Sequence, residues 1–350
     1  MNHGMTKKLF DHYLSQANIV NKNKGNFMNI KNLFVEKYNK AIVTGGTGFI
    51  GSHIVEELIE LGIDVVCVDD GSAGKVENVS AHFDKTNFQY FECDIVDYNK
   101  LKTIFNNVDI VFHNAASKKN ICLKDPRRDL DVNSKGTFNL LELSRDNGVA
   151  KFVHASTGSV YGEAQFFPQT ENHPFNPVSY YGVSKLAGER YVQLFNHLYN
   201  LDTSILRYFH VYGPRQEHNE FGGVVSIFIR NMIRDENPTI FGDGTQERTF
   251  TYVKDLVKAN LLVAIKDEAN GEDYNCASGI AVTINELCFE VIKLFEKEGK
   301  LKPKYEDWLI GDIKKFDVSN KKIIELGLSF EKDFFKMLNY TIQEMKKYLK

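Results

Sequence analysis

The sequence predicts an α/β fold in which a doubly wound parallel sheet is followed by a smaller C-terminal α/β lobe. Over the first half of the chain, apolar segments of strand length alternate with segments of helical apolar spacing. Such a succession forms a parallel sheet with helices on both faces. The alternation weakens after about residue 207, where glycines and loops become frequent. We therefore expect an N-terminal extension at 1–39, a sheet domain at 40–206 and a second lobe at 207–350, from which some segments return to the sheet.

The individual elements follow from their apolar patterns, taken in chain order. Strands are expected at 40–44, 64–68, 87–93, 108–113 and 151–156, and helices at 52–59, 98–106, 129–147, 180–199, 224–235 and from Phe330 onward. Within the extension, helical spacing also predicts two short helices that lie on the body of the protein. Their apolar residues are Leu9, Tyr13 and Leu14 in the first, and Ile30, Leu33, Phe34 and Tyr38 in the second.

Composition excludes several classes of partner. The chain has 350 residues, of which 43% are hydrophobic and 25% charged, and its formal charge is −3 without a long basic block. Neither nucleic acid nor a membrane is therefore expected as a partner. The five cysteines are scattered and never form a Cys-x-x-Cys pair, so no disulfide framework or metal site is predicted. The extension has no apolar core of the kind a secretion signal needs, and we expect a cytoplasmic protein.

A glycine-rich turn follows the first strand. Gly45, Gly48 and Gly51 stand between the strand and the next helix, where glycines permit a sharp turn, close approach of a pyrophosphate and close packing of helix on strand. The second strand ends at Asp69, about 20 residues further on, where a carboxylate binds the ribose hydroxyls of adenosine. These features predict a Rossmann-type dinucleotide site. The carboxylate favours NAD over NADP, whereas Lys75 nearby would favour the phosphate of NADP.

The other strands of the sheet should also end at this site, because ligands bind at the carboxyl ends of parallel strands. On this rule Asp94, Ala115, Ala116 and the Ser156-Thr157 pair are expected to face the cofactor. Asp94 could accept the adenine amino group or cap the next turn. Two histidines in the strands, at positions 113 and 154, are expected to be buried core residues.

Tyr181 and Lys185 are candidates for the chemistry. A spacing of four places both side chains on one face of a helix. A lysine ammonium beside a phenol should lower the pKa of the phenol and make it a general base. With Ser156-Thr157 and a dinucleotide site, these residues predict removal of a proton from an alcohol while hydride leaves the same carbon for a nicotinamide.

The chain resembles the extended short-chain dehydrogenases/reductases of the nucleotide-sugar epimerase and dehydratase family, from about residue 40 to 328. The resemblance is carried by the segments Thr44–Gly51, Ser156–Gly162, Tyr181–Lys185, Arg207–Arg215 and Ile240–Gly244. It implies that Thr157 hydrogen-bonds the reacting hydroxyl, that Tyr181 is the base, and that Lys185 tunes Tyr181 and holds the nicotinamide ribose. It also implies a role in polysaccharide biosynthesis and a homodimer built from the helices at 129–147 and 180–199.

Gly158-Ser159 distinguishes between branches of this family. Branches similar to dTDP-glucose 4,6-dehydratase have Asp-Glu here, and UDP-glucuronate decarboxylases usually have Glu at the second position. Without these carboxylates the site has no evident acid and base for elimination. We therefore expect an NAD-dependent 4-epimerase of a nucleotide-diphospho-sugar, most similar to those acting on UDP-hexoses, with UDP-N-acetylhexosamine or UDP-hexuronate also possible as substrates. The alternatives are a 4,6-dehydratase, 4-oxidase or decarboxylase of the same family, and a non-catalytic NAD-binding sensor.

The expected binding residues form two sets. The residues expected to bind NAD are Gly45, Gly48, Phe49, Ile50, Gly51, Asp69, Ser72, Gly74, Asp94, Ile95, Ala115, Ala116, Asn133, Ser156, Tyr181, Lys185 and Tyr208. Those expected to bind the sugar nucleotide are Lys118, Thr157, His210, Val225, Phe241 and Arg248. Four positions depart from the family pattern. His210 stands where the family usually has Asn. Leu309 stands where an arginine that binds the phosphate is common, and Thr249 and Lys254 stand where the family often has acids.

Overall fold

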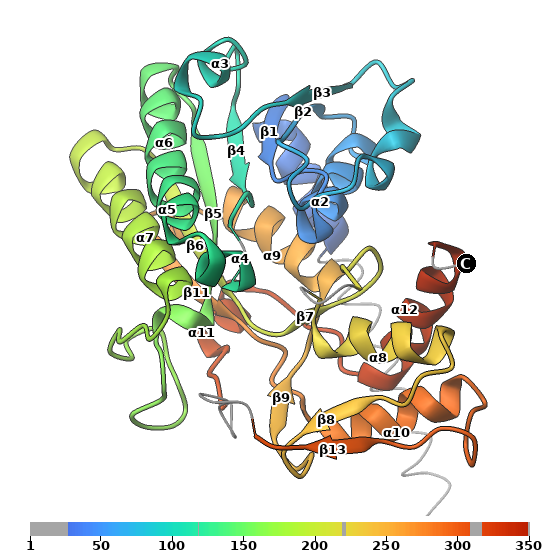
Figure 1. The fold of residues 1–350 in the computed structure, drawn as a ribbon. Coiled ribbons are helices and arrows are strands. Elements are labelled where there is room, and N and C mark those ends of the chain that lie inside the picture. Colours follow the sequence, from blue (N-terminus) through green and yellow to red (C-terminus); the bar gives the residue numbers. More distant parts are fainter. Residues whose placement is uncertain (1–26, 118, 219–221, 309–316, 349–350) are drawn as a thin grey trace, which may run out of the picture.

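The computed structural model describes residues 27–117, 119–218, 222–308 and 317–348, and contains the predicted doubly wound parallel sheet. Seven parallel strands lie in the order β11-β6-β5-β4-β1-β2-β3 (Figure 1). In chain order they are β1 (Lys40–Thr44), β2 (Asp64–Asp69), β3 (Phe88–Glu92), β4 (Ile110–His113), β5 (Lys151–Thr157), β6 (Thr203–Tyr208) and β11 (Glu272–Cys276). The predicted fold class and the five predicted strands are confirmed.

The strand order reverses at β1. The chain passes from β1 outward through β2 and β3, then returns to the other side of β1 to add β4, β5 and β6. Such a reversal opens a crevice at the carboxyl ends of the two strands that diverge, and ligands bind there in open α/β sheets. The glycine-rich turn after β1 and the segment after β4 lie at this crevice.

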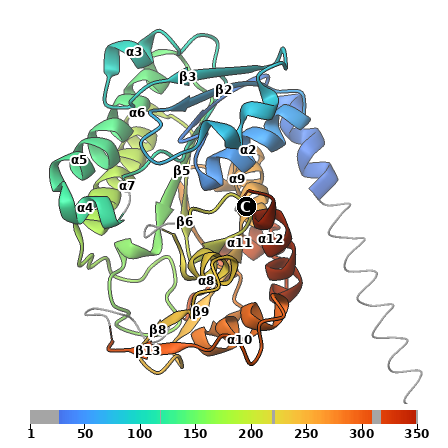
Figure 2. The ribbon, with the colours of Figure 1, turned by 45° about the vertical axis from the view of Figure 1, so that its right-hand side comes forward.

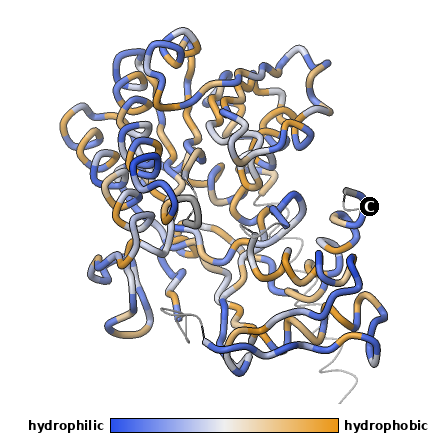
Figure 3. Tube along the Cα trace, viewed as in Figure 1, coloured by the Kyte–Doolittle hydropathy of each residue, from blue (hydrophilic) through white to orange (hydrophobic). Residues whose placement is uncertain are grey.

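Each face of the sheet is covered by helices through its own apolar cluster. On one face, α2 (Phe49–Glu60), α9 (Val253–Ile265) and a helix at 27–37 pack against the strands. On the other face lie α3 (Tyr98–Lys102), α6 (Thr137–Asp146) and α7 (Tyr180–Tyr199). Hydrophobic and hydrophilic residues alternate along α6 and α7 (Figure 3), as expected of helices with one face on the sheet. The central strands are therefore shielded on both sides, whereas most residues of the edge strand β3 are exposed or half-buried.

The helix predicted at 129–147 is interrupted. The segment consists of α5 (Pro126–Leu130), a π-helical turn at Asp131–Gly136 and α6, and a further helix α4 (Lys119–Lys124) precedes it. A Cβ atom at Gly136 would lie 2.5 Å from Ile95 Cδ1, so the glycine lets the wide turn approach the loop after β3. A single π-helical turn shifts the apolar pattern by only about one residue, which explains why one continuous helix was predicted. The helix predicted at 98–106 ends earlier, at Lys102.

The second lobe lies below the sheet (Figure 2) and has its own core. Its helices are α8 (Val224–Ile233), α10 (Ile284–Leu294) and α12 (Phe334–Tyr348). Its short strands form three pairs: β7 (Val211–Tyr212) with β10 (Thr251–Tyr252), β8 (Thr239–Phe241) with β13 (Lys304–Glu306), and β9 (Glu247–Thr249) with β12 (Ala281–Thr283). Strand β6 crosses the boundary drawn at 206, and β11 leaves the second half of the chain to join the sheet. The division into domains stays a prediction.

The second predicted helix of the extension packs on the sheet domain. Ile30, Phe34 and Tyr38 are buried, and the Tyr38 hydroxyl donates a hydrogen bond to the Ala264 carbonyl at 2.5 Å. Leu33, which was predicted to share this face, is exposed. The first predicted helix of the extension, with Leu9, lies outside the described residues. Over the described part of the chain, no helix combines the length and hydropathy needed to cross a membrane.

Candidate active site

The glycine-rich turn brings main chain against main chain. Gly45 has a φ of +65°, and a Cβ atom there would lie 2.7 Å from the Ala115 nitrogen at the end of β4. A Cβ atom at Gly51, in the first turn of α2, would lie 2.1 Å from the Gly45 carbonyl oxygen. Side chains are thus excluded at both positions. The N-terminal N–H groups of α2 remain available to an anion such as a pyrophosphate.

Asp69 is held at the end of β2 by its own neighbours. Its carboxylate accepts hydrogen bonds from the main-chain N–H groups of Thr47 and Gly71, each at 3.0 Å. The first of these donors belongs to the glycine-rich turn, so the carboxylate has a fixed place beside the residues that would hold a pyrophosphate. This is the arrangement that the sequence predicted for a ribose-binding acid.

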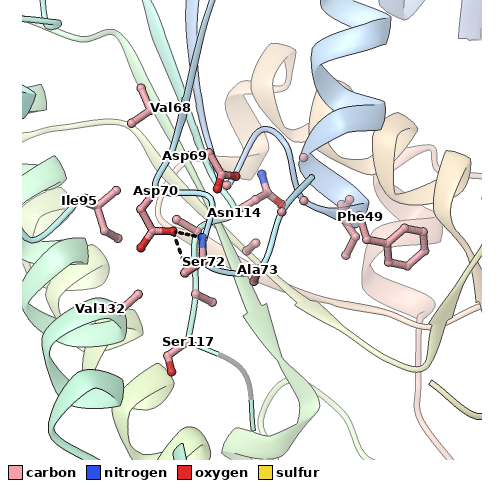
Figure 4. A pocket seen from close by; sticks show the side chains of 18 of the residues that line it. Phe49, Val68, Asp69, Asp70, Ser72, Ala73, Ile95, Asn114, Ser117 and Val132 are labelled. Atoms are coloured by element: carbon pink, nitrogen blue, oxygen red, sulfur yellow. Dashed lines mark hydrogen bonds between the residues drawn. The ribbon is translucent and has the colours of Figure 1, made fainter. Parts of the chain in front are cut away.

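A cavity of about 310 Å³ lies at the crevice. All of the residues predicted to bind the cofactor line it except Asn133. Figure 4 labels Phe49, Asp69, Ser72 and Ile95 among them. The sequence did not predict a further group of lining residues: Val68, Asp70, Ala73, Cys93, Asn114, Ser117, Arg128, Val132, Ala155 and Glu217. Asp70 and Asn114 directly adjoin predicted residues, so widening the predicted segments would have found them. In the sequence, Arg128 adjoins none of the residues predicted to bind the cofactor.

Asn133 lies behind the cavity, fully buried in the π-helical turn. Its side-chain oxygen accepts from the Ser117 N–H at 2.9 Å, and its amide nitrogen donates to Asp129 Oδ1 at 2.7 Å and Ser184 Oγ at 3.0 Å. Asn133 therefore joins the segment after β4 to α5 and α7. A direct contact with the cofactor stays a prediction.

Asn114 provides a test of whether the cavity suits a dinucleotide. Both polar atoms of its side chain are buried, and neither has a hydrogen-bond partner among the described residues. Buried amide groups are nearly always hydrogen-bonded, so such a pair facing a cavity indicates a polar ligand or water. With the close-packed glycines and the Asp69 carboxylate, these residues fit NAD.

Tyr181 and Lys185 stand in the first turns of α7 and line the same cavity. Ser179 caps this helix, since its hydroxyl accepts from the Gly182 N–H at 3.1 Å. The Lys185 side chain is 1% exposed, and its Nζ donates to the Ala155 carbonyl at 2.7 Å. The predicted pair is thus brought to the end of β5, next to Ser156 and Thr157.

Burial has the largest effect on the pKa values of both Tyr181 and Lys185. Burial raises the pKa of Tyr181 to about 12, although its hydrogen bond with Thr157 lowers the value in part. The Lys185 ammonium donates to the Ala155 carbonyl, and the tuning of Tyr181 by Lys185 stays a prediction. Burial lowers the pKa of Lys185 itself to about 8, while the Glu189 carboxylate opposes that shift.

Glu189 connects the site to a buried ion pair. Its carboxylate accepts a hydrogen bond from Ser156 Oγ at 2.5 Å and is held by the Arg207 guanidinium through contacts of 2.8 and 3.0 Å. Arg207 and Glu189 are both fully buried. Asp273 also pairs with this guanidinium, at 2.6 Å. The ion pair fixes Ser156 and places a negative charge one helical turn from Lys185.

The two strand histidines are core residues, as predicted. His113 and His154 are both fully buried, and burial lowers the pKa of each well below its ordinary value. His113 lies between the hydroxyls of Thr44 and Thr137, at 2.8 and 2.9 Å from them. His154 Nε2 lies 3.4 Å from Lys185 Nζ. Both imidazoles are therefore neutral near pH 7.

Gly158 has no room for a larger side chain. A Cβ atom at this position would lie 2.3 Å from Cε1 of the Phe209 ring. The next residue, Ser159, interacts with Thr157: its N–H donates to Thr157 Oγ1 at 3.1 Å, and the two hydroxyl oxygens are 3.3 Å apart. An acid and base pair of the kind that elimination requires is thus replaced by a glycine packed under a ring and a serine that orients Thr157.

The residues predicted to bind the sugar nucleotide do not line the cofactor cavity. Thr157 is at the end of β5, His210 follows β6, Phe241 ends β8 and Arg248 lies in β9. Burial and the nearby charge of Arg248 lower the pKa of His210 to about 3, so this histidine is neutral. Val225 is 2% exposed in the core of the second lobe. Lys118 and Leu309 lie outside the described residues.

The two other unusual positions have structural roles. Lys254, which replaces an acid, pairs with Glu56 of α2 at 2.7 Å, and Arg215 pairs with the same carboxylate at 2.8 Å. These contacts join the second lobe to the helix that follows the glycine-rich turn. Thr249 is buried in β9.

Comparisons with known proteins agree with this site. The model of the NAD dependent epimerase/dehydratase family matches residues 41–277. A putative UDP-glucose 4-epimerase of Methanocaldococcus jannaschii is 39% identical over 307 residues, which are 87% of this chain and 98% of that protein. The crystal structure of UDP-glucose 4-epimerase with UDP-glucose from Thermotoga maritima superposes with a TM-score of 0.83 at 37% identity, over 89% of this chain and 100% of that one.

A second solved structure has a different ligand. The UDP-N-acetylglucosamine 4-epimerase of Methanobrevibacter ruminantium, in complex with UDP-N-acetylmuramic acid, has a TM-score of 0.84 and 34% identity. It covers 89% of this chain, which in turn covers 99% of that one. The similarity thus extends across both lobes.

Proposed function

The chain belongs to the NAD dependent epimerase/dehydratase family, and on this premise we propose that it is a nucleotide-sugar 4-epimerase that acts on a UDP-hexose. The observation that carries the proposal is the contact of Gly158 with the Phe209 ring. It leaves the alcohol chemistry of Thr157, Tyr181 and Lys185 in place without the carboxylates that a dehydratase needs. The relatives described above, which are 4-epimerases of UDP-sugars, support the same choice.

In the proposed mechanism Tyr181 removes the proton of the C4 hydroxyl, which Thr157 orients through the hydrogen bond it shares with the phenol. Bound NAD supplies the hydride acceptor for the same carbon. The ammonium of Lys185 favours the phenolate form of Tyr181, and this phenolate accepts the proton of the C4 hydroxyl. After the 4-keto sugar turns in the pocket, Tyr181 returns the proton to the alkoxide as hydride returns to the other face.

The alternatives within the family require groups that the site does not present at the predicted positions. A dehydratase with an acid at position 158 would have to displace the Phe209 ring, and Ser159 stands where a decarboxylase usually has Glu. A non-catalytic sensor would have no use for Tyr181 and Lys185 assembled in one cavity with Ser156. We therefore keep the epimerase as the proposed function.

Product analysis tests the proposal. The purified protein is incubated with NAD and, separately, UDP-glucose, UDP-N-acetylglucosamine and UDP-glucuronate, and the sugar nucleotides are separated by chromatography. We expect the C4 epimer of at least one of them. A keto sugar or a decarboxylated product would refute the proposal and favour the alternatives.

We also propose a homodimer formed through α7 and the neighbouring α6. Val183, Tyr191, Leu194 and Leu198 are exposed along α7 at spacings that place them on one apolar stripe. An apolar stripe of this kind indicates a protein interface. Sedimentation should show a dimer for the wild type and a monomer for Leu194→Glu combined with Leu198→Glu. Phe289→Glu, at an exposed position on α10, is the matched control and should leave the dimer intact.

We further propose that the enzyme works in the reducing cytoplasm. All five cysteines are buried thiols, which agrees with a compartment where disulfides do not persist. Non-reducing mass analysis of protein from cells should find five thiols, and a disulfide would contradict the proposal.

A further inference from the structure

Arg128 crosses from helix α5 to two loops of the sheet. One guanidinium nitrogen lies 2.8 Å from Asp70 Oδ2, and the other lies 2.7 Å from Asp94 Oδ2. Asp70 follows β2 and Asp94 follows β3, so the two contacts join one side of the cofactor cavity to the other. All three residues line the cavity, and Figure 4 shows Asp70 together with Ile95 and Val132 around it.

The position of these residues identifies which end of the cavity they occupy. Asp69, the ribose-binding acid of the proposed cofactor site, directly precedes Asp70. Tyr181 and Lys185 mark the nicotinamide end and come from α7. The bridge of Arg128, Asp70 and Asp94 therefore lies at the adenosine end.

Each member of the bridge is fixed independently. Asp70 Oδ1 accepts from the N–H and hydroxyl of Ser72, and Asp94 Oδ1 accepts from the Val96 N–H. The N–H of Arg128 donates to Asp125, which caps α5. Side chains whose carboxylates are already oriented lose little conformational entropy when the guanidinium binds them. The Arg128 side chain is 30% exposed, so the ion pairs are partly shielded from solvent.

We propose that Arg128, Asp70 and Asp94 form an ion-pair clasp that closes the adenosine end of the cavity and slows release of the bound dinucleotide. The clasp rests on the cofactor site of the proposed function. Because it ties α5 to the loops after β2 and β3, the adenosine can leave only after both ion pairs open. The clasp also offsets two of the three carboxylates around the adenosine, and thereby reduces their repulsion of the pyrophosphate.

Release of NADH tests the clasp. Protein loaded with NADH is mixed with excess NAD, and the loss of NADH fluorescence is followed by stopped flow. We expect Arg128→Gln to release NADH roughly threefold to tenfold faster than the wild type, the range for a partly shielded ion-pair network. Calorimetry with ADP-ribose, which has the adenosine end without the nicotinamide, should show a parallel loss of affinity.

Matched variants separate the clasp from a general surface effect. Arg145 also has a 30% exposed side chain and contacts two carboxylates, those of Glu142 and Asp146, but it is not among the residues that line the cavity. Arg145→Gln should release NADH at the wild-type rate. Asp70→Asn keeps a side-chain oxygen that accepts from Ser72, and this variant should release NADH faster than the wild type. The double variant Asp70→Asn with Arg128→Gln should release NADH only a little faster than Arg128→Gln alone, because both changes break the same ion pair.

Salt provides a test in the wild type that needs no variant. At about 1 M NaCl, where exposed charges are strongly screened, release from the wild type should approach the rate of Arg128→Gln, and release from the variant should change less. Equal release by wild type and Arg128→Gln at low salt would refute the clasp. Failure of the wild type to bind NADH at all would instead refute the cofactor site of the proposed function.

Discussion

Replacing Gly51 by alanine is expected to damage the cofactor site through the backbone alone. A Cβ atom at this position would lie 2.1 Å from the Gly45 carbonyl oxygen, 2.8 Å from its carbonyl carbon and 3.0 Å from the Gly46 Cα. All three atoms are main chain, so no side chain can turn away to relieve the contact. To restore ordinary contact at 3.4 Å, α2 and the turn must separate by about 3.4 − 2.1 = 1.3 Å.

The cost can be estimated from this displacement. Overpacking by one methyl group in a close-packed region typically costs about 1–3 kcal/mol. The strained atoms belong to the turn that is proposed to hold the pyrophosphate, where NAD binding would need them in the native position. If the strain is relieved by opening the turn, the same free energy weakens binding by roughly 5-fold to 150-fold. If the turn keeps its native position, the same free energy appears instead as a loss of folding stability.

The assay measures both quantities. NADH affinity is obtained by fluorescence titration and the free energy of unfolding by urea denaturation. Gly223→Ala is the matched control: like Gly48 it precedes a helix, but it does not line the cavity, its φ is −75°, and its Cβ atom would meet only the Gln216 side chain, at 2.8 Å. The end of the Gln216 side chain can turn away, and we expect an affinity within about threefold of wild type. Equal affinity and equal stability of the two variants would refute the reasoning.

The remaining predictions concern the catalytic pair and its buried surroundings. Tyr181→Phe should abolish epimerisation in the product assay and still bind NADH in a fluorescence titration, whereas unchanged turnover would remove Tyr181 as the base. Glu189→Gln breaks a fully buried ion pair with Arg207 and should lower the free energy of unfolding in urea by about 3–5 kcal/mol. The control Glu290→Gln removes an ion pair with Lys293, whose side chain is 61% exposed, and should lower the free energy of unfolding by less than about 1 kcal/mol. Equal losses in the two variants would contradict the burial of the Glu189 and Arg207 ion pair. The pKa of Lys185 falls from its ordinary 10.5 to about 8 on burial, so between these pH values the unfolded chain binds more protons. Stability of the wild type relative to Lys185→Met, measured in urea at about pH 7.5 and about pH 9.5, should therefore rise with pH, and a fall would contradict the placement of the lysine.

Local signals explain which parts of the molecule the sequence could predict. The turn of Gly45, Gly48 and Gly51 is encoded within a few residues, as is the Tyr181 and Lys185 spacing, and both lie where predicted. The parallel sheet follows from strand periodicity and the rule for crossover connections. These features depend on neighbours along the chain.

Other parts depend on contacts between distant segments. Arg128 meets Asp70 and Asp94 across 58 and 34 positions of the sequence, and no local pattern marks those partners. The pKa of Tyr181 is set by burial, which the spacing of two residues on a helix does not reveal. The π-helical turn at 131–136 shifts the apolar pattern of the helix by only about one residue and could not be distinguished from a continuous helix.

Proton NMR of the reaction in heavy water tests the central claim most directly. The protein is incubated with NAD and the UDP-sugar that the product assay identifies, and the ring protons are followed. We predict that the 4-epimer forms with the proton at C4 retained and no deuterium at any ring carbon, because hydride leaves and returns within the site. Deuterium in the ring together with a keto sugar would show elimination of water, and would contradict a 4-epimerase built around Gly158 and Ser159.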